Sequence, residues 1–517
     1  MKKLISIILL VLMIIPIAVS CASDDATTVT TAPITTTAPI TTTAPVTTTA
    51  PITTTSPLTT TAPQTTTQTT VPVVFSSKTV IKKDWKYDSI DVACTTWSGS
   101  AAYPWSTMEL VITDGETSSW GENIDDAVLE RKEYIENTYG VEVNFLNTTR
   151  YKMQDVLEEA ELSGYCYYEL AMPRVVSVQS MVAGGQVYDL NDREYIDFDN
   201  EYYNDASIKA FTAQSHTFFI AGDFSNLDKE TAYALYFNKD LLGGKEATEA
   251  LYKKVREGKW TFDQLISLCN GAYDDNGDGE RDDDDKFGIE FINCDKFYQY
   301  FGVNQVGTDA SGKWVATLND ERVDQILDAI IVAKKSDWSR VAYEGNWGYS
   351  GEKMFKNKKI IFYEECINNM QNIKSDNLGV VPFPMLNEDQ GRYCVPVSTQ
   401  LYTLMCVPKA TRDREMSDYF IDVLAWTGSE YVMEAYYEDI FAGLGTDDEK
   451  DMIKNYIFPN IVYDAGASAG LTTLFSNALG KTHSNAVNNF DKAYGDALPN
   501  AQKTINEWNT AWSSYKE

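Results

Sequence analysis

A short repeat divides this chain of 517 residues into a segment that cannot build a core and a body that can. Over residues 27–72 the unit TTTAP, once TTTSP, recurs with a proline at every sixth position from Pro33 to Pro63. Proline fixes φ and lacks an amide donor, and threonine supplies little apolar surface. This segment therefore cannot bury enough apolar surface to fold. We therefore expect a disordered, extended and semi-rigid linker, with a reach on the order of 130 Å at roughly 3 Å per residue.

The sequence before this linker is typical of an export signal. Residues 1–20, MKKLISIILLVLMIIPIAVS, place two lysines before an apolar stretch that is too short for a membrane span and ends in small residues. The residues AVS precede Cys21, which resembles a bacterial lipobox, although leucine is more usual where Ala18 stands. This resemblance implies a lipoprotein signal peptide at 1–20 and a lipidated Cys21 that anchors the linker, residues 21–77, to the extracellular face of the cell membrane. The alternative is ordinary cleavage and release, with Cys21 incidental.

The charge balance excludes some partners. The chain has 75 acidic against 43 basic side chains, a formal net charge of −32. Such a surface repels phosphate backbones and anionic lipid, so we expect no nucleic-acid partner and no electrostatic docking on a membrane. Neutral and cationic ligands remain open, and aromatic residues, 12% of the chain, can pack in a core or stack on flat ligands.

Histidine and cysteine usage excludes several kinds of site. His216 and His483 are the only histidines, and we interpret both as surface or structural residues rather than as catalytic or zinc-binding ones. Beyond Cys21 there are seven cysteines and no CxxC spacing, so we expect neither a disulfide framework nor a metal knuckle. Mostly free thiols in an exported protein would suit an anaerobic setting.

Beyond the linker the hydrophobic pattern alternates between strand and helix periodicity. It predicts strands at 89–97, 141–147 and 167–174, separated by amphipathic helices at 125–140 and 150–164. Such alternation builds a mostly parallel α/β sheet, which binds ligands at the carboxyl ends of its strands. The loop after the first strand, which carries two tryptophans and a tyrosine, would lie at that edge.

Seven strings occur in the order that is found in one bacterial family. They are YELAMPRVVSVQSMVAGGQVYDLND, FFIAGDFSN, ALYFNKDLLG, EGKWTFDQLISLCNGAYDDNGDGERDDDDKFGI, MFKNKKIIFYEE, LGVVPFPMLNEDQGRY and LMCVPKATRD. Through them the chain resembles, over roughly residues 85–515, the bacterial extracellular solute-binding proteins of type 1. These are the capture components of ABC importers, and the likeness is to the large lipoproteins of Gram-positive anaerobes in particular.

The resemblance implies a fold and a function. It implies a two-lobed, periplasmic-binding-protein-like fold of type II, with the ligand closed into a cleft between the lobes. By this analogy the first lobe takes residues 85–225 and 397–445, and the second takes 226–396 and 446–517. We expect a monomeric receptor that captures a sugar or oligosaccharide, delivers it to the permease and performs no catalysis.

The loop 274–285, DDNGDGERDDDD, has the spacing of a calcium-binding loop. Calcium takes six to eight oxygen ligands, and a twelve-residue loop supplies them from positions 1, 3, 5, 7, 9 and 12 with a glycine at position 6. Here those positions are Asp274, Asn276, Asp278, Glu280 (through its carbonyl), Asp282 and Asp285, with Gly279 at the turn. We expect a structural Ca²⁺, because eight acidic side chains in this loop would otherwise repel one another. The alternative is an exposed acidic turn that binds nothing tightly.

A sugar site needs aromatic faces for the rings and polar groups for the hydroxyls. By loose analogy with the family, the candidate ligand-binding residues are Trp97, Ser98, Arg174, Asp223, Tyr298, Tyr300, Trp347 and Glu364, with Tyr349 as a further aromatic. For each aromatic the alternative is core packing, and Arg174 and Glu364 could form an ion pair instead.

Two other functions remain open. A tethered glycoside hydrolase would need two carboxylates at a defined separation, but no string marks such a pair and no other catalytic motif occurs. A cell-surface carbohydrate-binding or adhesion module would suit the linker and the dockerin-like loop, but dockerins need two such loops and this chain has one.

Overall fold

The computed structural model describes residues 82–516, except 97–121, 150–152, 293, 320, 343–349, 400, 472 and 481–485. The predicted signal peptide, Cys21 and the Thr/Pro linker lie outside these described residues. By its contacts the chain divides into two units, 1–73 and 74–517, and all the described residues belong to the second. Within the described residues, none of the helices combines the length and apolarity needed to cross a membrane.

The first sheet is parallel and has the strand order β2-β1-β3. Its strands are β1 (Ser89–Thr96), β2 (Glu142–Thr149) and β3 (Leu170–Met172). The connecting helices are α1 (Glu122–Tyr139) and α2 (Met153–Ser163), and α3 (Val175–Ala183) follows β3. The predicted order of strands and helices is confirmed, and the largest difference in length is at the third strand, predicted at 167–174 and found at Leu170–Met172.

The second sheet is mixed and has the strand order β10-β7-β11-β6-β12. Its strands are β6 (Tyr233–Asn238), β7 (Phe287–Phe291), β10 (Ser339–Val341), β11 (Ile360–Cys366) and β12 (Leu378–Val381). Strands β7, β10 and β11 run parallel, whereas β6 is antiparallel to both β11 and β12. Every residue of β6 and β7 is buried, as expected for continuous apolar strands that are covered on both faces.

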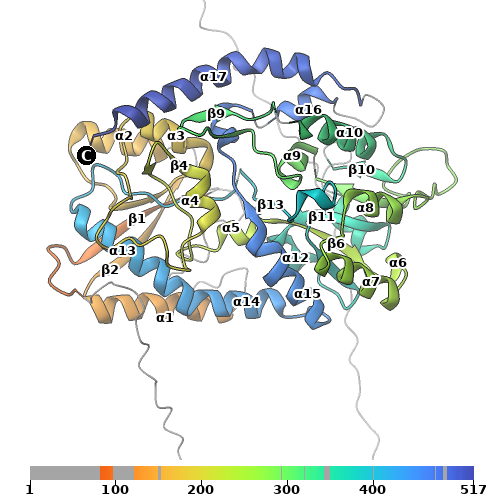
Figure 1. Ribbon diagram of the computed structural model, residues 1–517. Coiled ribbons are helices and arrows are strands. Elements are labelled where there is room, and N and C mark those ends of the chain that lie inside the picture. Colours follow the sequence, from red (N-terminus) through yellow and green to blue (C-terminus); the bar gives the residue numbers. More distant parts are fainter. Residues whose placement is uncertain are drawn as a thin grey trace, which may run out of the picture. The chain divides into compact units, whose positions relative to one another are not determined.

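Helices cover the second sheet and join it to the first (Figure 1). The longer ones are α7 (Lys245–Arg256), α8 (Phe262–Cys269), α10 (Arg322–Lys335), α13 (Arg414–Thr427), α14 (Met433–Phe441) and α17 (Phe490–Ser514). The shorter elements are α4 (Asp205–Phe211), β4 (Thr212–Ala213), β5 (His216–Thr217), α5 (Leu227–Glu230), α6 (Lys239–Leu242), α9 (Phe297–Tyr300), β8 (Val306–Thr308), β9 (Trp314–Ala316), α11 (Gly351–Lys356), α12 (Met370–Ile373), β13 (Val395–Pro396), α15 (Asp447–Asp451), β14 (Ile461–Val462) and α16 (Leu474–Ala478).

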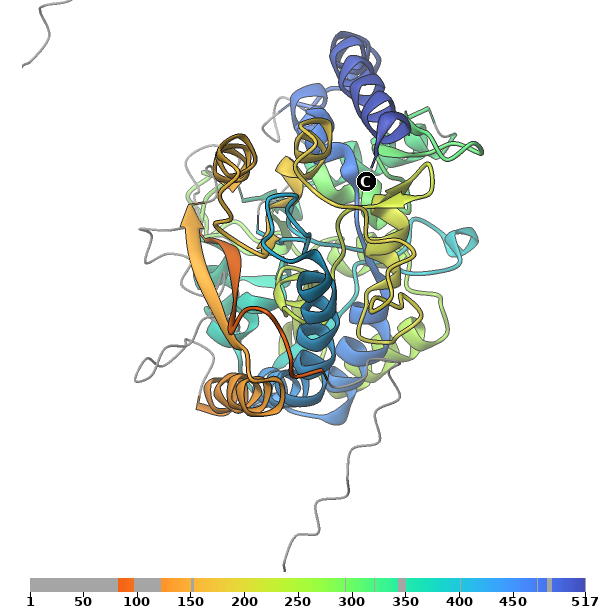
Figure 2. The ribbon, with the colours of Figure 1, turned by 90° about the vertical axis from the view of Figure 1, so that its left-hand side faces the viewer.

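The chain passes more than once between the two sheets. It leaves the first sheet after Ile220, which bridges to Met405, and enters the second at β6. It returns from β13 to Cys406, which bridges to Ala171 of β3. Figure 2 shows α13 lying beside the first sheet. The fold is therefore α/β, with two sheets joined by several crossing segments.

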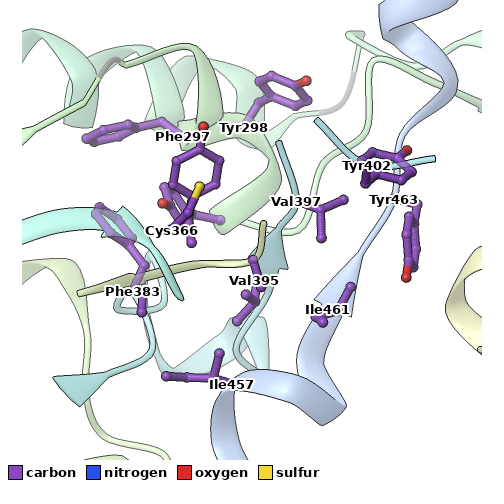
Figure 3. Close-up of a cluster of buried hydrophobic side chains, with 14 of the residues drawn as sticks. Phe297, Tyr298, Cys366, Phe383, Val395, Val397, Tyr402, Ile457, Ile461 and Tyr463 are labelled. Carbon is purple, nitrogen blue, oxygen red and sulfur yellow. The ribbon is translucent and has the colours of Figure 1, made fainter. Parts of the chain in front are cut away.

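One hydrophobic cluster includes residues of both sheets, from Ala93 and Ala171 to Ile289 and Phe362. Around the short strands β13 and β14 it consists of aromatic and branched side chains (Figure 3). A second cluster, with Ile90, Val92 and Leu170, packs the other face of the first sheet against α13.

Helix α17 lies across the predicted division into lobes. It packs on α3, in the range predicted for the first lobe, and on β9 and α16, in the range predicted for the second (Figure 1). Trp512 is buried between Phe218 and the ring of Trp314, so the helix contacts both parts through one side chain. The lobe boundaries themselves stay a prediction.

Candidate functional site

Two polar residues lie at the carboxyl ends of β1 and β3 in the first sheet. Thr95, near the end of β1, is 3% exposed, and among the described residues its hydroxyl has no hydrogen-bond partner. Arg174 follows β3, precedes α3 as its N-cap and is 4% exposed, with its backbone bridged to Thr403. This edge is where the sequence predicted a ligand, but Trp97, Ser98, Trp347 and Tyr349 lie outside the described residues.

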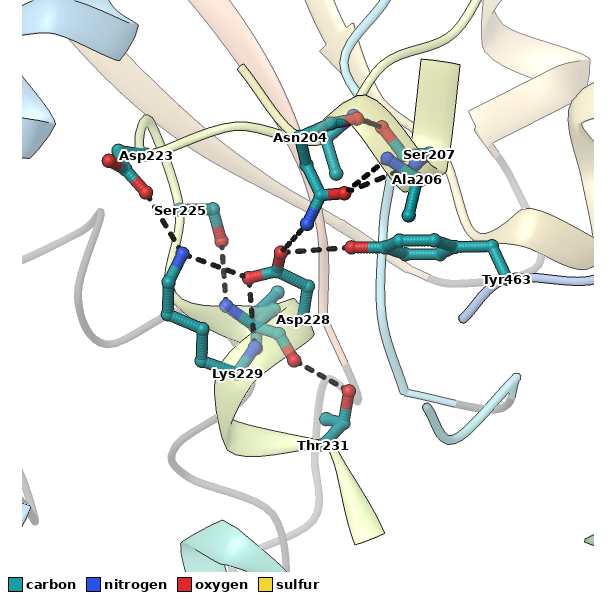
Figure 4. Close-up of polar contacts among 11 residues, drawn as sticks. Asn204, Ala206, Ser207, Asp223, Ser225, Asp228, Lys229, Thr231 and Tyr463 are labelled. Atoms are coloured by element: carbon teal, nitrogen blue, oxygen red, sulfur yellow. Dashed lines mark hydrogen bonds and ion pairs between the residues drawn. The ribbon is translucent and has the colours of Figure 1, made fainter. Parts of the chain in front are cut away.

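The first crossing segment carries a polar network that includes Asp223 (Figure 4). Lys229 Nζ lies 2.9 Å from a carboxylate oxygen of Asp223 and 3.6 Å from one of Asp228. Asp228 also accepts hydrogen bonds from the Asn204 amide at 3.2 Å and from the Tyr463 hydroxyl at 2.9 Å. Burial alone would lower the pKa of Lys229, but the charges of Asp223 and Asp228 raise it above its usual value, so the ammonium stays charged.

This network joins three segments that are far apart in sequence. Asn204 precedes α4, Asp228 belongs to the crossing segment, and Tyr463 follows β14. Sequence reasoning singled out only Asp223 among these residues. Asparagine, aspartate and tyrosine at such separations carry no local pattern, so nothing in the sequence indicated that they meet.

The predicted ligand residues of the second lobe lie in its interior. Tyr300 is 1% exposed, its ring stacks on Phe383 at 3.9 Å, and its hydroxyl donates a hydrogen bond to Glu364. Glu364 is fully buried, and its other oxygen accepts a hydrogen bond from the Ile292 amide at 3.1 Å. Burial raises the pKa of Glu364 to about 8.

Tyr298 has a similar environment. It is 4% exposed and stacks on Phe475 with the ring centroids 5.1 Å apart. The short helix α9 turns all four of its side chains into the core, so Tyr298 and Tyr300 have the packing that we gave as the alternative for an aromatic. Glu364 pairs with Tyr300 rather than with Arg174, and the assignment of these residues to a ligand site stays a prediction.

The acidic loop 274–285 is held by hydrogen bonds and ion pairs of its own. Asp285 is fully buried and accepts hydrogen bonds from the amides of Asn276 and Asp282 and from the Tyr273 hydroxyl. Asp274 lies 2.7 Å from Lys286. Among the described residues, no group of three or more His, Cys, Asp and Glu side chains is arranged to hold a metal ion.

Two cavities formed by described residues lie beside the crossing segments. The first, which we call the Tyr437 cavity, measures about 920 Å³ and is lined in part by Asp223, Lys229, Tyr437 and Phe441. The second measures about 880 Å³ and lies between α4, the segment after α9 and β14. Asp223 is therefore the one predicted ligand residue that lines either of these two cavities.

Comparisons with known proteins gave structural matches only. No family model matches the chain, and no curated protein matches it. Among solved structures, the ABC substrate-binding protein from Listeria monocytogenes in complex with cycloalternan is 13% identical, with a TM-score of 0.50 over 81% of this chain and 99% of that one.

Two further structures are similar. The galacto-N-biose/lacto-N-biose I-binding protein of the Bifidobacterium longum ABC transporter, in complex with lacto-N-biose, is 12% identical, with a TM-score of 0.51 over 82% of this chain and 97% of that one. The cyclic α-maltosyl-1,6-maltose binding protein from Arthrobacter globiformis is 14% identical, with a TM-score of 0.53 over 81% of this chain and 98% of that one.

Each of these matches extends over nearly the whole length of the solved chain. At sequence identities this low, the similarity shows that the folds are alike and nothing more. The chain therefore has the two-lobed, periplasmic-binding-protein-like α/β fold of the substrate-binding proteins of ABC transporters.

Proposed function

We propose that this chain is an extracellular solute-binding lipoprotein of an ABC importer. We propose further that its cargo is a carbohydrate, and an oligosaccharide in particular. The observation that carries the proposal is the fold, which is shared over four fifths of the chain with the binding proteins for cycloalternan, lacto-N-biose and cyclic α-maltosyl-1,6-maltose. The seven family strings in the sequence support the same assignment.

Binding would use the region between the two lobes. A ligand that contacts both lobes favours the closed arrangement by the difference between its affinities for the closed and open forms. Arg174 and Thr95 at the carboxyl edge of the first sheet, with Trp97, are the proposed contacts on one side. The Asp223–Lys229 pair and Tyr437 add charged and aromatic groups that line a cavity of about 920 Å³ beside the crossing segment, a size that suits small molecules.

The closed form would dock on the permease and release its cargo there. Acylated Cys21 would keep the receptor at the cell surface, and the Thr/Pro linker would hold it away from the membrane. We propose that the receptor acts as a monomer and that its partners are the sugar, the permease and the membrane reached through the lipid.

We also propose that the acidic loop 274–285 holds a structural Ca²⁺. Its support is the spacing of oxygen-bearing residues at Asp274, Asn276, Asp278, Asp282 and Asp285. The carboxylates of Asp278 and Asp282 each accept a hydrogen bond from the backbone amide two residues further along the loop. The loop therefore already turns tightly at both positions.

The proposal is tested by thermal unfolding of the full chain against a panel of oligosaccharides. The panel includes cycloalternan and lacto-N-biose, and a rise in Tm with one of them identifies a cargo. Trp97→Ala should abolish that rise, whereas the control Tyr165→Ala changes a surface tyrosine that is 62% exposed and should leave it intact. If no sugar stabilises the chain, the carbohydrate assignment fails.

The same samples separate the alternatives. A hydrolase would release reducing ends from the sugar that stabilises it, and an adhesion module would bind immobilised polymer without a soluble oligosaccharide ligand. Release of reducing ends would replace the binding function with a catalytic one.

A further inference from the structure

A short 3₁₀ helix, Ala465–Ala469, packs on α3 near the carboxyl edge of the first sheet. We call it the 465–469 helix. The hydroxyl of its residue Ser468, which is half-buried, donates a hydrogen bond of 2.6 Å to the carbonyl oxygen of Val175 in the first turn of α3. Val175 directly follows Arg174, one of the proposed sugar contacts. This hydrogen bond therefore lies beside the proposed ligand edge.

Helix α3 is fixed to the first sheet. Its N-cap, Arg174, follows β3 closely in the chain and bridges through its backbone to Thr403. Val175 is fully buried, in the hydrophobic cluster that also contains Ala93 of β1 and Ala171 of β3. Because packed side chains tie neighbouring elements together, α3 must move with the first sheet.

The 465–469 helix is fixed to a different part of the molecule. It follows Asp464, whose buried carboxylate accepts hydrogen bonds from the amides of Gly466 and Gln305, each at 2.9 Å. A Cβ atom at Gly466 would lie 2.6 Å from the Cβ atom of Gln305, so the two segments pack closely. The position of the 465–469 helix is therefore set by the residues around Gln305.

Those residues are connected to the second sheet. Gln305 follows α9 closely in the chain, and Tyr300 of α9 donates a hydrogen bond to Glu364 of β11. The hydrogen bond from Ser468 to Val175 thus joins an element held on the second sheet to one held on the first. A movement that separates the two sheets at this edge must break it.

The ligand edge of the first sheet is covered in this structure. The polar residues Thr95, Arg174 and Thr403 are all buried there. A ligand has to reach such residues before it can bind them, so the sheets must separate at this edge to admit one and approach again to enclose it. The present arrangement therefore corresponds to the closed form.

We propose that Ser468 is a latch of the cleft, whose hydrogen bond to Val175 stabilises the closed form and is broken when the cleft opens. This inference rests on the proposed function and adds to it the residue that controls closure. A hydrogen bond of this kind changes an equilibrium about fivefold in net terms, so the latch favours closure without preventing the release of cargo.

Amide hydrogen exchange in the ligand-free full chain tests this proposal without a sugar. The first amides of α3 have no acceptor within the helix, so their exchange depends on the access of solvent to this edge. Ser468→Ala should raise the exchange rate at the start of α3 about fivefold. Strand β6, which is buried throughout in the second sheet, reports global unfolding, and its exchange should not change.

The matched control is Ser180→Ala. Ser180 is an exposed residue of the same helix, and its hydroxyl donates a hydrogen bond to Gln154 of α2, which also belongs to the first sheet. This variant should leave exchange at the start of α3 unchanged. Native exchange in Ser468→Ala, an equal rise in Ser180→Ala, or a rise that extends to β6 would each overturn the latch.

Sugar affinity gives a second measurement. With a sugar from the panel that raises the Tm, Ser468→Ala should weaken binding about fivefold, because the closed form becomes less populated. Ser180→Ala should bind as tightly as the native chain, and native affinity in Ser468→Ala would overturn the latch. If no sugar binds, the carbohydrate assignment fails, whereas the exchange experiment still decides whether Ser468 acts as a latch.

Discussion

Gly428 shows how strongly a single residue can limit this fold. It begins the π-helical stretch Gly428–Val432 between α13 and α14. A Cβ atom there would lie 1.8 Å from the carbonyl oxygen of Asp223, on the first crossing segment. Because the opposing atom belongs to the backbone, no rotamer change can relieve the clash.

We therefore expect Gly428→Ala to lower the free energy of unfolding by about 2 kcal/mol or more, since the backbone of α13 or of the crossing segment must shift. Urea denaturation measures the change. The matched control is Gly495→Ala in α17, where no other atom lies within 4 Å of the added carbon. Alanine favours helix over glycine, so the control should be neutral or stabilising, and a comparable loss in both variants would contradict the steric explanation.

Glu364 makes stability depend on pH. Burial raises its pKa from 4.5 to about 8 in the folded protein. Between these values the folded protein keeps a proton that the unfolded chain has released, so the free energy of unfolding falls as the pH rises through this range. Below pH 4.5 both states are protonated, and the dependence on this group ends.

Glu364→Gln removes this titration and keeps a polar partner for Tyr300. The variant should match the native protein near pH 5 and exceed its free energy of unfolding by about 2 kcal/mol or more near pH 8.5. Urea denaturation at the two pH values measures the difference, with Glu246→Gln on the exposed face of α7 as the control. An equal effect of Glu364→Gln at both pH values would show that its carboxyl group does not titrate in this range.

At the scale of one element, the loop 274–285 combines a buried anchor with exposed carboxylates. Asp285 is fully buried and holds the loop from within, whereas Asp283 and Asp284 pair with Arg340 at 2.8 Å and Lys359 at 2.9 Å. Asp275 and Asp278 are both exposed. Only Asp278 stands at a predicted ligand position, so these two neighbours form a matched pair for a test.

If the loop binds Ca²⁺, millimolar calcium should raise the Tm of the EGTA-treated chain by about 2–5 °C, because the ion binds only the folded loop. Asp278→Asn should reduce this rise. Asp275→Asn removes the same charge from the same loop but no predicted ligand, and should change the rise less. Identical melting curves with EGTA and with calcium would contradict the proposal that this loop holds a structural Ca²⁺.

At the scale of the whole molecule, two sheets share one hydrophobic cluster through the crossing segments. The network around Asp228 ties the first crossing segment to residues before α4 and after β14. Movement of one lobe on the other must therefore bend these segments, because each sheet is a continuous packed layer.

We predict that the sugar identified by thermal unfolding also makes the molecule more compact. Small-angle X-ray scattering should show a smaller radius of gyration with that sugar, since the closed form is favoured by contacts to both lobes. A sugar from the panel that does not raise the Tm is the control, and the linker contributes equally to both samples. Stabilisation with an unchanged radius of gyration would indicate a rigid binding module without hinge closure.

The sequence alone determined the properties that depend on neighbours along the chain. Proline and threonine at a six-residue period predict a linker without reference to anything else. Hydrophobic periodicity correctly indicated β1, α1 and β2 and the α/β class, because burial on one face is recorded locally in each element.

Tertiary structure alone decided which side chains meet. The string KFYQYFG offered two tyrosines for a ligand, yet α9 directs Tyr298 and Tyr300 into the core, and Tyr300 bonds to Glu364 from a strand more than sixty residues further on. The Asp228 network is likewise assembled from distant segments. Such contacts depend on how the elements pack, and local periodicity contains no information about packing partners.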